Sequence, residues 1–169
     1  MTIKNELNEA LWQDISESSL ALLNGVIKDM QSVLEDELPY DIKNVKEICS
    51  RYQDEDVESF LVGIERFGNK FQDYSESLTN INVLKNNERI NVDENKDLFN
   101  SFKKFISRFI KYVNDLYEHM ESEYEDIKEV DTRFDDLYET CSGLPKLIEH
   151  ALFHLDFYEA LTENINKGM

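Results

Sequence analysis

Residues 99–141 read FNSFKKFISRFIKYVNDLYEHMESEYEDIKEVDTRFDDLYETC. Apolar side chains recur along this stretch in alternating steps of three and four residues, which is the spacing of one buried face of an α-helix. They are Phe99, Phe102, Ile106, Phe109, Val113, Leu116, Met120, Ile127, Val130, Phe134, Leu137 and Cys141. One interruption leaves two interpretations open. The stretch is either a single helix about 60 Å long or two helices with a break near Glu123 or Asp131.

The composition of the whole chain favours the same kind of structure. The 169 residues suffice for one domain with its own core, and 41% of them are hydrophobic. Only five Gly and two Pro are present, so long helices with short connections are expected. We predict a single all-α domain over residues 1–169, an antiparallel bundle of about four long helices with coiled-coil-like seams. A helical hairpin of two very long arms is the competing architecture.

The periodicity upstream of residue 99 predicts two more helical stretches. The first runs from Ile3 to Leu38 and ends at Pro39, because proline lacks the backbone donor that a helix interior needs. The second covers residues 41–81. Its apolar phase slips by one residue at residues 53–56, which predicts a kink or a short break there.

The remaining segments are a loop and a last helix. Residues 80–95 lose the periodicity and contain six Asn, which predicts the main loop, with a small hairpin at residues 83–92 as the alternative. Gly143 and Pro145 then predict a stop and a new start, followed by a helix over residues 146–166. That helix is apolar over more than half of its circumference, so it is either the most buried helix or meets another chain.

Charge and cysteine content limit the partners and the compartment. The chain has 36 acidic and 18 basic residues, and its net charge of −18 opposes direct binding to nucleic acid or to an anionic membrane. The first residues lack the apolar segment of a secretion signal, and no run of apolar residues is long enough to span a membrane. We expect a cytoplasmic protein in which Cys49 and Cys141 are buried free thiols.

The sequence offers no pattern typical of catalysis. It contains no Cys-x-x-Cys, no Gly-x-Gly-x-x-Gly and no Gly-x-x-x-x-Gly-Lys, so we expect neither an enzyme nor a cofactor. His150 and His154, four residues apart on the last helix, are weak candidates for metal ligands, and His119 and Glu123 have the same spacing. The alternative is that His154 is a core histidine and that His119 borders a carboxylate-rich surface.

Acidic residues concentrate in the second half of residues 99–141. Residues 115–139 contain eleven acids against two bases, a net charge of −9. Most of these acids face away from the apolar seam, and three Tyr follow one flank at multiples of seven residues. The predicted partner-binding residues are Glu118, Glu121, Glu125, Glu129, Asp135, Asp136, Glu139, Tyr117, Tyr124 and Tyr138. The alternative is a solvated bundle face with Tyr packed at its edge.

Of all the features of the sequence, this acidic surface gives the clearest indication of function. It predicts a small intracellular protein-binding module of the inhibitor, immunity or antitoxin kind, which docks an acidic helix on a basic protein partner. One alternative is a nucleic-acid mimic that blocks a DNA- or RNA-binding enzyme. Another is a structural or assembly subunit that forms a homodimer through its last helix, where Phe153 and Phe157 lie away from the main seam.

Overall fold

The computed structural model describes residues 18–83 and 91–168, and all its regular elements are helical. Residues 18–32 are helical and lead into the π-helical turn η1. The elements are η1 (Val33–Glu37), α2 (Leu38–Cys49), α3 (Glu55–Val83), α4 (Val92–Glu123) and α5 (Lys128–Gly168). No strand occurs in these two described segments. The predicted all-α bundle of four long helices is confirmed.

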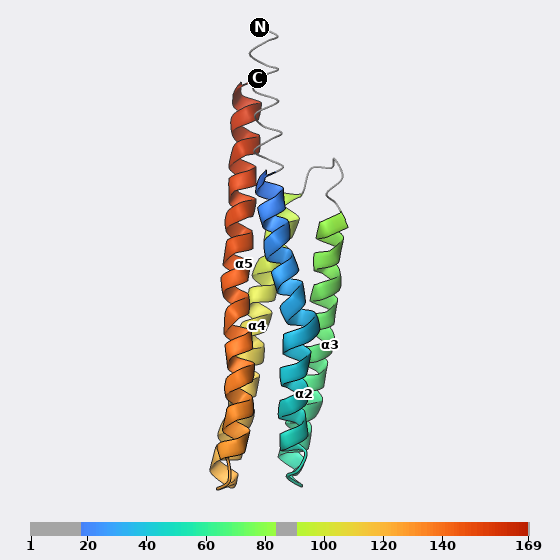
Figure 1. Cartoon of the computed structure of the whole chain (residues 1–169), viewed down its shortest axis with the longest axis vertical. Helices are drawn as coiled ribbons and strands as arrows, with labels where there is room; N and C mark the ends of the chain where they lie inside the picture. Colours follow the sequence, from blue (N-terminus) through green and yellow to red (C-terminus); the bar gives the residue numbers. More distant parts are fainter. Residues whose placement is uncertain (1–17, 84–90, 169) are drawn as a thin grey trace.

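The four helices lie side by side along one axis and alternate in direction (Figure 1). The first of them is continuous over residues 18–49, and η1 forms part of it. Short turns join α2 to α3 and α4 to α5 at the same end of the bundle. In order around the bundle, α2 packs on α5, α5 on α4 and α4 on α3, whereas α2 and α3 make less extensive contact.

The core is apolar and rich in aromatic rings. Between α3 and α4, ring centroids lie 4.6 to 6.3 Å apart, within the range of favourable aromatic packing. The rings that meet there are Phe67, Phe71, Tyr74, Phe102, Phe105 and Phe109. Cys49 and Cys141 are buried free thiols, as predicted, and burial raises the pKa of both to about 12. Neither thiol is therefore reactive at neutral pH.

The first helix does not end at Pro39, so that prediction was wrong. The backbone stays helical through Pro39 to Cys49. Just before the proline, the Leu38 N–H donates to the carbonyl of Val33, five residues earlier, which makes the turn wider than in an α-helix. The wider turn accommodates a proline ring that would otherwise crowd the preceding turn. Residues 3–17 of the predicted helix lie outside the described part.

Of the kink or short break predicted at residues 53–56, the structure has the break, and the chain reverses fully there between α2 and α3 (Figure 1). Asp54 ends the turn and caps α3. Its Oδ1 accepts hydrogen bonds from the N–H groups of Asp56 and Val57 at 2.8 and 3.3 Å. A carboxylate at this position satisfies free N–H groups and favours the start of a helix. The slip in the apolar phase therefore marks a helix end.

The interruption near Glu123 is also a turn. Residues 124–127 join α4 to α5, so residues 99–141 form two helices. At the other end of the bundle, α3 extends to Val83, and α4 begins at Val92, next to Asn91, whose side chain accepts from the N–H of Glu94 at 3.1 Å. The connection is thus shorter than the predicted loop at residues 80–95. The alternative hairpin falls largely on residues 84–90, outside the described part.

Gly143 and Pro145 lie inside α5, so the predicted helix boundary there was wrong. The reason is the apolar seam, which continues without a break across both residues. Leu137, Cys141 and Leu144 are each at most 1% exposed. Burial contributes about 1.5–3 kcal/mol for each large apolar side chain, and together these contributions exceed the cost of about 3 kcal/mol for an interior proline.

Candidate functional site at the turn end

The two short turns lie at the same end of the bundle, which we call the turn end (Figure 1). The rings of Tyr52 and Tyr124 pack with their centroids 4.3 Å apart. The Tyr52 hydroxyl donates to Asp126 Oδ1 at 3.2 Å, and Arg51 forms an ion pair with Glu129 at 3.6 Å. These contacts hold the turns together, so the acidic residues of both turns share one surface.

Asp54 lies at the centre of the turn end. Its Oδ2 accepts a hydrogen bond from the Tyr124 hydroxyl at 2.7 Å and lies 2.9 Å from His119 Nε2. The hydrogen bonds from Tyr124 and His119, with those from the backbone of α3, hold the pKa of Asp54 well below its usual range. The same bond raises the pKa of Tyr124 to about 12. Asp54 is therefore an ionised link between α3, α4 and the second turn.

One group of described residues has the spacing of metal ligands. One ligand atom each from Asp54, Asp56 and His119 lies within 4.8 Å of the others. Both oxygens of Asp54 already accept hydrogen bonds, so a cation would compete with the cap of α3. His150 and His154 do not belong to this group. His150 is exposed, and the His154 ring packs 5.6 Å from the ring of Phe153.

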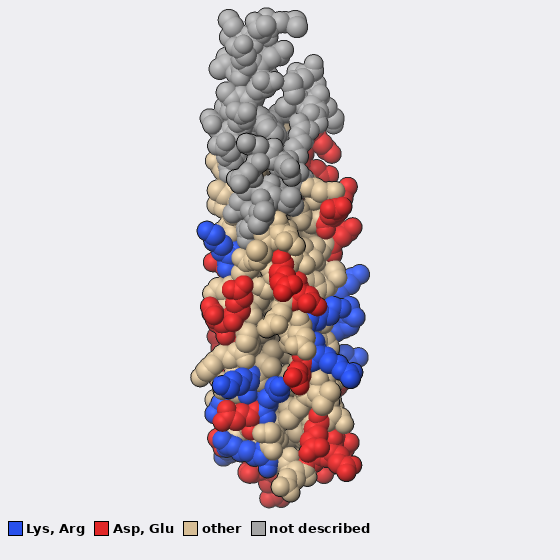
Figure 2. Space-filling view, turned by 90° about the vertical axis from the view of Figure 1, so that its right-hand side faces the viewer, with Lys and Arg blue, Asp and Glu red and all other residues tan. Residues whose placement is uncertain are grey.

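The predicted carboxylates lie on the surface. All seven side chains are exposed: Glu118, Glu121, Glu125, Glu129, Asp135, Asp136 and Glu139. Among the described residues, Glu129 alone of these seven has an ion-pair partner. Figure 2 shows acidic side chains at the turn end, at the bottom of the view, with basic side chains among them and further acidic side chains along the bundle. This surface is therefore strongly negative and largely uncompensated.

The structure adds acidic residues that the sequence did not connect with this surface. Glu55, Asp56 and Glu58 lie in the first turn of α3 and are exposed at the same end of the bundle. They precede residue 118 by some sixty positions in the chain. Only the reversal at Asp54, where the periodicity indicated a kink or a short break, brings them to the turn end.

The acids at the end of α4 occupy unfavourable positions. Glu121 and Glu123 are exposed near the C-terminus of this helix, and its last turn contains no basic residue. The negative end of the helix dipole disfavours each carboxylate there by about 0.3–1 kcal/mol. The acids that begin α3 have the opposite, favourable relation to their helix dipole.

The three predicted tyrosines are half-buried between helices. Tyr117 packs on Phe134 with ring centroids 5.3 Å apart, and a hydrogen bond with Asp131 raises the pKa of Tyr117 to about 12. The Tyr138 hydroxyl is buried, and no described residue bonds to it. Burial raises the pKa of Tyr138 above its usual range. These rings, like that of Tyr124, contribute to internal packing.

Tyr40 is the tyrosine that the sequence analysis missed. Its side chain projects from α2 and is 65% exposed. It lies in a shallow surface pocket together with Glu37, Asp136 and Glu139. Its position on the acidic surface depends on the packing of α2 against α5, which the heptad spacing of the other tyrosines did not indicate.

No protein-family model matches the chain, and no curated protein matches it. No described helix is both long and apolar enough to cross a membrane. The chemistry of the protein's own surface therefore has to indicate its function.

Proposed function

We propose that this protein is a binding module that docks the acidic surface of its turn end on a basic surface of a protein partner. The exposed carboxylates near the end of α4 support this proposal most strongly. Glu121 and Glu123 repel their acidic neighbours and oppose the helix dipole, so they do not stabilise the fold. A cationic partner would relieve both effects.

The surface suits recognition by charge combined with an aromatic anchor. Dense negative charge accelerates association with a basic protein and disfavours acidic competitors. Tyr40, beside Asp136 and Glu139, supplies an exposed ring of the kind that contributes most to interfaces. An inhibitor, immunity protein or antitoxin acts in this way when it covers the basic functional surface of its target. We place this activity in the cytoplasm, where free thiols such as Cys49 persist.

Affinity capture from the native host, followed by mass spectrometry, tests the proposal. The key variant reverses three exposed acids, Glu118→Lys, Glu121→Lys and Glu125→Lys. We expect the wild-type chain to recover a basic protein and the variant to recover much less of it, because the complementary charge is lost. Equal recovery by both chains would overturn the proposal.

A matched control separates local charge from net charge. Asp29→Lys, Asp73→Lys and Asp97→Lys change the net charge by the same amount at exposed positions far along the bundle from the turn end. We expect this control to capture the partner as the wild-type chain does. If the protein acts as a nucleic-acid mimic, a short DNA or RNA duplex should compete with it for the same surface of the partner.

Self-association is a second candidate function, which rests on α5. Phe153 and Phe157 are 65% and 46% exposed, respectively, more than large apolar side chains usually are. A second copy of the chain that packs on these rings would remove them from water. Light scattering at several concentrations tests this, and we expect Phe153→Ser with Phe157→Ser to abolish any dimer. A monomer at all concentrations would exclude it.

A further inference from the structure

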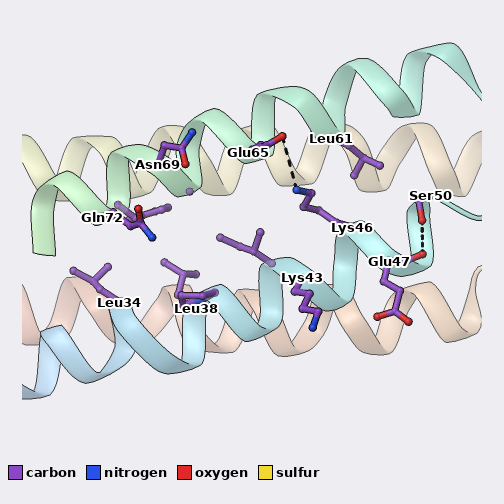
Figure 3. A pocket seen from close by; sticks show the side chains of 14 residues that line it. Leu34, Leu38, Lys43, Lys46, Glu47, Ser50, Leu61, Glu65, Asn69 and Gln72 are labelled. Carbon is purple, nitrogen blue, oxygen red and sulfur yellow. Dashed lines mark hydrogen bonds and ion pairs between the residues drawn. The ribbon is translucent and has the colours of Figure 1, made fainter.

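A groove runs along the surface between the first helix, over η1 and α2, and α3 (Figure 3). Its volume is about 640 Å³. The buried side chains of Leu34, Leu38, Ile42 and Phe71 form much of its lining, with polar groups at the rims. Sites for small molecules have this character, with volumes of about 300–1,000 Å³ and a mostly apolar lining.

Gly68 lies on the α3 side of the groove and contributes no side chain to its lining. A Cβ atom at this position would meet nothing within 4 Å. Glycine inside a helix costs about 1 kcal/mol relative to alanine. At Gly63, on the same helix, packing explains the glycine, because a Cβ atom there would overlap the hydroxyl of Tyr112. No such contact explains Gly68, and its missing side chain leaves the groove open.

A positive charge lies toward one end of the apolar lining. The Lys46 side chain reaches across the groove to Glu65, while Leu34 and Leu38 lie further along the same wall (Figure 3). The Lys46 Nζ to Glu65 Oε2 distance is 4.0 Å, and both side chains are more than one-third exposed. A pair this long and exposed contributes little, so an anionic group can replace Glu65. Lys43 lines the same wall and has no ion pair among the described residues.

We propose that this groove binds a free long-chain fatty acid. The acyl chain lies over Leu38 and Gly68 toward Leu34, and the carboxylate binds Lys46 in place of Glu65. Two cationic side chains, Lys43 and Lys46, beyond an apolar floor match a ligand with one anionic head and one apolar tail.

A fluorescence titration of the full chain with cis-parinaric acid, a fluorescent fatty acid, tests the site. We expect a saturable rise in emission that palmitate reverses. Gly68→Leu fills the groove and should weaken binding by about tenfold or more. Gly25→Leu is the matched control, because Gly25 is also helical, lies outside the groove, and has open space around its Cβ position. Leucine favours helix at both positions, so both variants should fold.

Two further variants test the carboxylate contact in opposite directions. Lys46→Gln should weaken parinaric acid binding several-fold, because the cation is lost. Glu65→Gln should strengthen it, because Lys46 is then free for the ligand. The absence of saturable binding would overturn the proposal. Wild-type affinity in Gly68→Leu, or a long-chain alcohol that competes as well as palmitate, would overturn it too. The acidic surface is a separate site, so these results leave the proposed docking function unaffected.

Discussion

The two edges of α3 differ sharply in how they are packed. One edge meets α4 through aromatic rings, and the Tyr112 hydroxyl occupies the space that a side chain at position 63 would need. The other edge faces α2 across the open groove, where Gly68 has free space above it. Two glycines five residues apart thus lie in opposite surroundings, because Gly63 allows close contact with Tyr112 and Gly68 borders open space. The comparison shows that glycine in a helix has to be interpreted through the neighbouring helix.

Truncation of a large side chain on each edge should show the largest difference. Phe109 is fully buried and packs on Phe67 and Phe71 at 5.2 and 5.1 Å between ring centroids. We expect Phe109→Ala to lower the free energy of unfolding by about 3–5 kcal/mol. Leu61→Ala, on the groove edge, should cost less than about 2 kcal/mol, because Leu61 is already partly exposed. Urea unfolding measures both values, and equal losses would contradict an open groove.

Alanine at the two glycines should change stability in opposite directions. Gly63→Ala displaces Tyr112, whose hydroxyl donates to the Phe60 carbonyl at 3.2 Å, and should destabilise the fold by about 1–3 kcal/mol. Gly68→Ala should stabilise it by up to about 1 kcal/mol through helix propensity. The double variant Gly63→Ala with Tyr112→Ala should recover part of the loss. Thermal melts that shift in the same direction for both single variants would show the two edges to be alike.

Asp54 caps α3 and so determines the residue at which this helix begins. The start of the helix determines in turn which side chains face α4 and which face α2. Because the folded-state pKa of Asp54 is lowered, its ionised form stabilises the fold above the pKa of an unfolded aspartate, about 3.9, and this contribution is lost progressively as the pH falls below that value. Asp54→Asn keeps an effective cap but loses the charge. We expect a lower melting temperature than wild type at pH 7 and a difference that shrinks below pH 4. A difference independent of pH would indicate that charge is not the cause.

The smallest predicted effect concerns repulsion on the acidic surface. Adding salt should raise the melting temperature slightly, because screening weakens repulsion between exposed carboxylates. The Glu121→Lys change should add about 0.3–1 kcal/mol of stability at the end of α4. Ion pairs elsewhere, such as Lys96 with Asp156 and Glu159 at 2.6 and 2.7 Å, oppose the salt effect. A melting temperature that falls with salt would mean that pairing outweighs repulsion.

The helices themselves could be predicted from the sequence, and breaks at residues 53–56 and near Glu123 were among the alternatives, but the reversal of the chain at these two breaks could not be predicted. Steps of three and four residues identified the buried seams because every long helix must bury one face. A proline in a helix interior is locally unfavourable, which is why Pro39 predicts a helix end and Gly143 with Pro145 predicts a stop and a new start. Packing along the seam and the π-helical turn η1 outweigh that penalty. The true turns, at Asp54 and after Glu123, depend on contacts such as that between Tyr124 and Asp54, which join residues 70 positions apart.

The candidate surface could be predicted only in part for the same reason. Exposure of the carboxylates from Glu118 to Glu139 followed from their positions opposite the seam. Tyr40 and the acids that begin α3 join them only through the turns and the packing of α2 on α5. The groove could not be predicted either, because in the sequence Gly68 indicates only a modest weakening of a helix.

We infer that the acids of the turn end serve binding at some cost to the fold. Melting temperature and association rate, measured together for the Glu118→Lys, Glu121→Lys and Glu125→Lys variant, test this claim. Surface plasmon resonance on the captured partner gives the rate. We predict that this variant melts higher than wild type and associates about tenfold more slowly, while the Asp29, Asp73 and Asp97 control associates at the wild-type rate. A wild-type association rate in the turn-end variant would contradict the claim.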